Sequence, residues 1–117
     1  MKWIIIALLV GFFLWRMMPA KGVQSVSTTD LKKVLKDKSK QFIDVRTPGE
    51  YKGRHLKEFK NIPLNTLKSQ LDGLDQSKET FVICQSGMRS AQAAKMLKKA
   101  GFTTVVNVTG GMSAWRG

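Results

Sequence analysis

The single cysteine of the chain, Cys84, stands where an apolar run ends and a helical pattern begins. The run 81–83 before it predicts a buried strand, and the stretch 90–97 after it predicts a helix. A loop between a strand and a helix gathers free main-chain N–H groups, which favour negative charge together with the helix dipole and Arg89. Because such surroundings lower the pKa of a thiol from about 8.5 to roughly 3.5–7.5, the sequence predicts a thiolate nucleophile at Cys84.

The residues of this pattern also have purely structural interpretations. A lone cysteine is often a small buried apolar residue, and an arginine such as Arg89 often makes a surface salt bridge. The enzymatic interpretation therefore requires that the Cys84 thiol ionises near neutral pH and is open to solvent. Asp44 and Arg46 are expected to pair or to hold main chain near the loop, and Glu50 is expected to cap a helix locally.

Length and charge restrict the classes of protein that this chain can belong to. The chain has 117 residues and one cysteine, which excludes an internal disulfide and hence a disulfide-rich secreted scaffold. The net charge is +12, but the lysines are dispersed and no aromatic residues alternate with them. We therefore expect no nucleic-acid partner.

The first 22 residues differ in composition from the rest, because residues 3–15 are uninterruptedly apolar. As a helix this run is about 20 Å long, which with flanking residues and local thinning approaches a bilayer core of about 30 Å. We predict a transmembrane anchor at 1–18 and a linker at 19–22. More basic residues follow the run than precede it, which predicts a single-pass membrane protein with its domain on the cytoplasmic side. A cleaved signal peptide, whose apolar region has about 7–15 residues, is the alternative.

After the leader, β-rich runs alternate with helical patterns. Strands are expected near 23–26, 41–45, 61–64, 81–84 and 104–108, and helical segments near 31–35, 64–74, 90–100 and 111–115. This alternation predicts one α/β domain over 23–117 with a mainly parallel sheet.

Three stretches of the domain resemble a single-domain rhodanese, a member of a sulfurtransferase family. They are Asp44-Val45-Arg46 with Glu50-Tyr51, then His55-Leu56 through Asn61-Ile62-Pro63, then Cys84-x-x-Gly87-x-Arg89-Ser90 followed by Gly110-Gly111-Met112 and Trp115. The resemblance covers about 23–115. It implies a five-stranded, mainly parallel sheet flanked by helices, here preceded by one N-terminal hydrophobic helix.

The resemblance also implies the roles of the residues around Cys84. It makes Cys84 the catalytic residue and assigns substrate binding to Gln85, Ser86, Gly87, Met88, Arg89 and Ser90. The chain departs from the family at Gln85, where members often have arginine, so the loop has one cation fewer.

The activity that the resemblance implies is sulfur transfer. The Cys84 thiolate would take a sulfane sulfur from a thiosulfate-like or persulfide donor and pass it to a thiol or cyanide-like acceptor. A protein persulfide can be the donor or the acceptor, the membrane is a partner of the N-terminal helix, and neither a metal nor an organic cofactor is expected.

Two other functions remain open at this point. The domain could be a non-catalytic, membrane-tethered binding module, or a redox sensor whose Cys84 is oxidised. A cysteine phosphatase or arsenate reductase is disfavoured, because that chemistry usually places five residues between cysteine and arginine and this chain has four.

Overall fold

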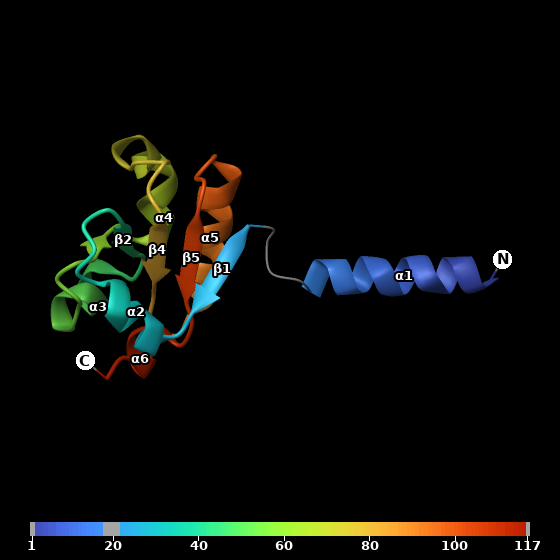
Figure 1. Cartoon of the computed structure of the whole chain (residues 1–117), viewed down its shortest axis with the longest axis horizontal. Helices are drawn as coiled ribbons and strands as arrows, with labels where there is room; N and C mark the ends of the chain where they lie inside the picture. Colours follow the sequence, from blue (N-terminus) through green and yellow to red (C-terminus); the bar gives the residue numbers. More distant parts are fainter. Residues whose placement is uncertain (1, 18–21, 117) are drawn as a thin grey trace.

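The computed structural model describes residues 2–17 and 22–116, whose elements are labelled in Figure 1. The first element is helix α1 (Lys2–Met17), which Figure 1 shows apart from the other helices and strands. Its apolar residues include Trp3, which is 83% exposed, and Leu8, which is 68% exposed. Of the predicted linker at 19–22, only Gly22 lies within the described residues.

The predicted transmembrane anchor and the predicted membrane location on the cytoplasmic side are wrong. Among the residues that the structure describes, no helix combines the length and the apolarity needed to cross a bilayer. Helix α1 has 16 residues. At 1.5 Å per residue it is about 24 Å long, against a hydrocarbon core of about 30 Å. The sequence-based interpretation relied on flanking residues and membrane thinning to close that gap.

The sheet confirms the predicted α/β class. Within residues 22–116, five strands lie in the order β1-β5-β4-β2-β3, and every neighbouring pair is parallel. Their bounds are β1 (Val23–Val26), β2 (Gln41–Asp44), β3 (Lys60–Asn61), β4 (Thr80–Ile83) and β5 (Val105–Val108). Because all strands run the same way, their carboxyl ends meet at one edge, where ligands bind in open α/β sheets.

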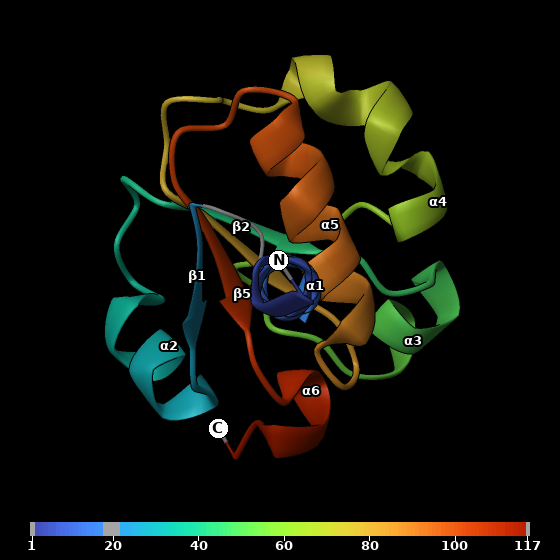
Figure 2. The ribbon, with the colours of Figure 1, turned by 90° about the vertical axis from the view of Figure 1, so that its right-hand side faces the viewer.

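Helices cover both faces of this sheet, as Figure 2 shows. The helices of residues 22–116 are α2 (Thr28–Val34), α3 (Pro48–Gly53), α4 (Leu64–Leu67), α5 (Met88–Lys99) and α6 (Gly111–Ala114). The segment predicted as one helix near 64–74 is α4 followed by a 3₁₀ helix, η1 (Lys68–Gly73). Helices α4 and α5 lie on one face of the sheet, and α2 and α6 lie on the other.

The core follows from the alternation of side chains along each strand. Phe42 and Phe81 pack on one face, while their neighbours Ile43 and Val82 pack on the other. The first face is completed by Leu31, Leu35, Val106, Met112 and Trp115, and the second by Leu67, Ala93, Ala94, Leu97 and Val105. Burial on both faces holds the strands rigidly, so the side chains at their carboxyl ends have fixed positions.

Three turns at the helix ends agree with the sequence. The side chain of Ser27 accepts a hydrogen bond from the N–H of Asp30 at the start of α2. Helix α3 begins with a capping box between Thr47 and Glu50, the local cap that the sequence predicts. Helix α5 is followed by Gly101 in the left-handed conformation, with φ of 103°.

Candidate active site

The Cys84 sulfur lies directly after β4, at the carboxyl edge of the sheet, beneath the start of α5. It accepts a hydrogen bond from the main-chain N–H of Gly87 at 3.0 Å. The hydroxyl of Ser90 lies 3.4 Å from the same sulfur. The loop and the first turn of α5 therefore direct donors at one atom, as the sequence predicts for this stretch.

Gly87 is the residue that lets the loop close around the sulfur. It has φ of 105°, a conformation that residues with a side chain rarely adopt, and it is the N-cap of α5. A Cβ at this position would lie 3.3 Å from the main-chain nitrogen of Gly110. Helix α5 consequently begins two residues earlier than the sequence pattern suggests.

Helix α6 supports the loop from below. The N–H of Met112 donates to the Cys84 carbonyl and the N–H of Ser113 donates to the Gln85 carbonyl, each at 2.9 Å. A Cβ on Gly111 would overlap the Cys84 carbonyl oxygen. The loop therefore rests on main chain from the last helix, and the approach is too close for a side chain.

Asn107 is a site residue that sequence reasoning missed. Its Oδ1 atom lies 2.5 Å from the Ser90 hydroxyl, and both residues are buried. The sequence contains a signal for it, because Asn107 is the one polar residue of strand β5, which is otherwise built of valine and entirely buried. A polar group in such a strand needs a hydrogen-bonding partner.

The surroundings of Cys84 change its acidity in two opposite ways. Burial on its own raises the pKa of the thiol. Hydrogen bonds from the Ser90 hydroxyl and from the main-chain N–H groups of Ser90, Gly87 and Ser86 outweigh burial, so the pKa of Cys84 is lowered from 9.0. The direction agrees with the thiolate that the sequence predicts.

The access of solvent to Cys84 does not agree with the sequence-based expectation. Cys84 and Ser90 are both 0% exposed. The thiol is covered by the groups that hydrogen-bond to it, so a reagent reaches the sulfur only when the loop moves.

Arg89 is bound by Glu50 through two parallel hydrogen bonds. The Nη1 to Oε1 distance is 2.6 Å and the Nη2 to Oε2 distance is 2.9 Å. Arg89 and the Thr47 cap together lower the pKa of Glu50 to about 2, and the Glu50 carboxylate raises the pKa of Arg89. The structure therefore confirms the alternative in which Arg89 makes a salt bridge. No feature of the sequence indicates that its partner is Glu50.

Asp44 and Arg46 form a second ion pair, as the sequence predicts. The Nη2 atom of Arg46 lies 2.8 Å from Oδ2 of Asp44, and the two side chains are 2% and 0% exposed. Arg46 also donates to the carbonyl of Arg54 at 2.6 Å and to Oε1 of Gln85 at 3.3 Å. Gln85 donates in turn to the hydroxyl of Ser113, so its side chain joins Arg46 to α6.

The other two residues of the loop point outward. Ser86 is exposed, and Met88 is 79% exposed. Over the described ranges 2–17 and 22–116, no group of three or more His, Cys, Asp or Glu residues is arranged to hold a metal ion.

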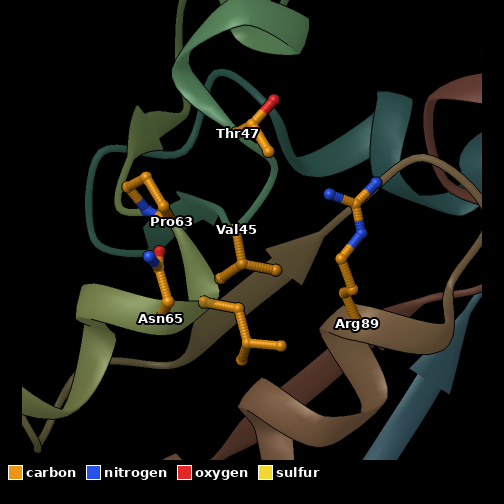
Figure 3. A pocket seen from close by; sticks show the side chains of 6 residues that line it. Val45, Thr47, Pro63, Asn65 and Arg89 are labelled. Atoms are coloured by element: carbon orange, nitrogen blue, oxygen red, sulfur yellow. The ribbon is translucent and has the colours of Figure 1, made fainter.

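A pocket of about 310 Å³ opens beside Arg89. Figure 3 shows its lining, in which the Arg89 side chain faces Val45 and Thr47 across the cavity. Val45, Pro63 and Leu64 give it a mainly apolar wall, and Thr47 and Asn65 add polar atoms. The structure thus combines a sulfur surrounded by donors with an arginine that is paired with a carboxylate, and that arginine also lines a mainly apolar cavity.

Comparisons with known proteins identify the family of the domain. A family model described as the rhodanese-like domain matches residues 27–117. The Bacillus subtilis protein named "Putative sulfurtransferase YtwF" is 38% identical over 96 residues, which are 81% of this chain and 92% of that protein. Another protein of that organism, "Putative sulfur carrier protein YrkF", is 37% identical over 99 residues, 84% of this chain but only 54% of its own length. The crystal structure of a rhodanese-like domain protein from Staphylococcus aureus has a TM-score of 0.73 and 34% identity, covering 79% of this chain and 90% of that one.

Proposed function

The chain belongs to the rhodanese-like domain family, and we propose that it is a sulfurtransferase in which Cys84 carries the transferred sulfur as a persulfide. The observation that carries this proposal is the set of donors around one sulfur atom, the Gly87 N–H at 3.0 Å and the Ser90 hydroxyl at 3.4 Å. Groups fixed in this way stabilise an anion without reorganising during the reaction.

The proposed reaction has two displacements at sulfur. The Cys84 thiolate attacks the sulfane sulfur of a donor, forming a new S–S bond while the electron pair of the broken donor bond leaves with the remainder. With thiosulfate that remainder is sulfite, and with a persulfide it is a thiolate. An acceptor thiolate or cyanide then attacks the terminal sulfur, and Cys84 leaves as a thiolate again.

The loop residues have different parts in this proposal. The N–H groups of Ser86, Gly87 and Ser90 and the Ser90 hydroxyl hold the sulfur anion, because each of them already lowers the pKa of Cys84. Gln85 fixes the loop through Arg46 and Ser113. Met88, at 79% exposure, lies where a partner would approach. The name of YrkF refers to a sulfur carrier, which supports a protein as donor or acceptor.

The burial of Cys84 adds a requirement to the mechanism. Because the residue is 0% exposed, the loop 85–89 has to move outward before a donor sulfur can align with the thiolate. After the transfer, the added sulfur atom occupies the space that the loop movement has opened. The main-chain N–H groups of the loop then donate to this terminal sulfur instead of to Sγ.

Mass spectrometry of the full chain tests the proposal. After incubation with thiosulfate or with 2-hydroxyethyl persulfide, Cys84 should gain the mass of one sulfur atom. Cyanide should then remove it as thiocyanate, and a Cys84→Ser variant should gain nothing. A wild-type chain that stays unmodified with both donors would refute sulfur transfer.

A further inference from the structure

Resting on the proposed sulfur transfer at Cys84, we propose that Glu50 determines the donor specificity of this site. By holding Arg89, it disfavours dianionic thiosulfate and leaves the pocket beside Arg89 to the persulfide of a thiol carrier with little charge. Glu50 acts through Arg89 and is not itself in contact with Cys84.

The Glu50 carboxylate is held in place from two sides. Its Oε1 atom accepts hydrogen bonds from the N–H and the hydroxyl of Thr47, each at 3.1 Å, as well as from Arg89. A bidentate pair between arginine and a carboxylate uses the same two N–H groups that would bind a sulfonate. An anionic donor must therefore displace a carboxylate that helix α3 already keeps in position.

The other arginines around the loop have partners as well. Arg46 is paired with buried Asp44, and Arg54 donates to the carbonyl of Trp115 at 3.0 Å and to that of Met112 at 3.5 Å. Gln85, directly after the cysteine, has no charge to add. Among the described residues, Arg89 and Arg46 are therefore each paired with a carboxylate, so neither offers an uncompensated positive charge to an anionic donor.

The charge of the donor then decides how easily it reaches the thiolate. Thiosulfate brings two negative charges toward a third, whereas a persulfide brings at most one. Two unit charges 4 Å apart repel by about 1 kcal/mol in water and about 4 kcal/mol at an effective dielectric constant near 20. With Arg89 occupied, this repulsion is larger for thiosulfate than for a persulfide.

The pocket favours the same class of donor through its lining. Its wall is formed mainly by Val45, Pro63 and Leu64. Thr47 and Arg89, which hydrogen-bond to the Glu50 carboxylate, also line it. The apolar part of the wall can cover the carbon chain of a thiol carrier, whereas it offers no hydrogen bonds to a sulfonate, which would depend on Thr47, Asn65 and the already paired Arg89. The Cys84 thiolate attacks the terminal sulfur of R–S–SH, so the Sγ–S bond forms, the donor S–S bond breaks, and R–S⁻ departs with its electron pair.

The test compares two donors on three full-length chains: wild type, Glu50→Gln and Glu79→Gln. Glutamine at position 50 can still complete the capping box, so only the charge that holds Arg89 is lost. Glu79 pairs with Lys40 at the amino end of β4, so its variant makes the same change in net charge away from the site. Glu50→Asp shortens the carboxylate and replaces the glutamine variant if the latter does not fold.

The measured quantity is kcat/KM for thiosulfate divided by kcat/KM for 2-hydroxyethyl persulfide. We expect this ratio to rise about tenfold in Glu50→Gln, equivalent to about 1.4 kcal/mol, and less in Glu50→Asp. It should stay at the wild-type value in Glu79→Gln. An equal ratio in wild type and Glu50→Gln, or an equal rise in Glu79→Gln, would overturn the inference while sulfur transfer itself stands. Absence of sulfur on wild-type Cys84 from either donor would instead refute the proposed function.

Discussion

The hydroxyl of Ser90 on helix α5 lies 2.5 Å from the side-chain amide of Asn107 on strand β5. The same hydroxyl lies 3.4 Å from the Cys84 sulfur and 3.1 Å from the Gly87 carbonyl. One hydroxyl has one proton, so it can donate to only one of these three neighbours at a time. The shortest of the three contacts is to Oδ1 of Asn107, and the Nδ2 atom of the same amide donates to the Gly87 carbonyl at 3.4 Å. Asn107 thereby fixes the position of the Ser90 side chain beside the sulfur.

Replacing Ser90 by alanine should make the thiol less acidic. The Ser90 hydroxyl is the largest of the contributions that lower the pKa of Cys84, so its loss raises that pKa. The rate of alkylation by iodoacetamide, followed against pH, should have its midpoint below 9.0 in wild type and higher in Ser90→Ala. The exposed side chain of Ser86 is the control, because Ser86→Ala keeps the N–H group. A common midpoint for all three chains would contradict this account.

Native alkylation should also be slow at every pH. Cys84 is 0% exposed, so reaction waits for the loop to open. We expect the native chain to react at least tenfold more slowly than the same chain in denaturant, compared at equal thiolate fractions. Equal rates in the two states would mean that the loop does not cover the sulfur in solution.

Asp44→Asn should strongly destabilise the domain. The substitution keeps the shape of the side chain but leaves the Arg46 guanidinium, which is 2% exposed, without its carboxylate. Removing one member of a buried ion pair lowers the free energy of unfolding by about 3–5 kcal/mol, measurable by urea denaturation. The matched control is Asp30→Asn, whose partner Lys33 is 73% exposed, and it should change stability by less than about 0.5 kcal/mol.

The contribution of Glu50 to stability should depend on pH in a defined direction. Its pKa is about 2 in the folded chain, below its ordinary value of 4.5, so folding favours the ionised carboxylate. The difference in unfolding free energy between wild type and Glu50→Gln should be complete above pH 4.5 and disappear as pH falls toward about 2. For a pair that is about one-third exposed we expect at most about 1 kcal/mol. A difference that grows on acidification would contradict the ion pair.

Gly111→Ala should damage the floor of the active-site loop. Gly111 has φ of 55°, and a Cβ there would also lie 2.8 Å from the main-chain atoms of Gln85. Overpacking of this kind typically lowers stability by about 1–3 kcal/mol. Thermal unfolding should show the loss, and Gly53→Ala, which has open space around it, is the control. A Gly111→Ala chain as stable as Gly53→Ala would mean that α6 can move away from the loop.

The fold and the cysteine loop were predictable because their signals are local. Apolar runs alternating with helical patterns indicate the strands, and Glu50 is expected to cap a helix locally, as it does at the start of α3. The same reasoning predicts a membrane span from apolar composition alone, whereas α1, with 16 residues, is shorter than the hydrocarbon core of a bilayer. It also treated 64–74 as one helix, although the hydrogen bonding changes to a 3₁₀ pattern at Lys68.

The remaining features of the site depend on distance in space and could not be read from spacing. Glu50 and Arg89 are 39 positions apart, and their pairing exists only because α3 and the start of α5 meet at the same edge of the sheet. The burial of Cys84 likewise follows from how the loop folds back on the sulfur. Asn107 is an intermediate case. The sequence shows a polar residue within an otherwise apolar strand, but it does not show that the hydrogen-bonding partner is Ser90.

The support of the loop by α6 has a consequence for protein synthesis. The carbonyls of Cys84 and Gln85 accept hydrogen bonds from the N–H groups of Met112 and Ser113. The loop around the Cys84 sulfur therefore lacks its support while those two residues are still inside the ribosome. A nascent chain therefore emerges with its cysteine as an ordinary, unshielded thiol. The acidic, sheltered sulfur forms only after α6 has been translated and has docked against the loop.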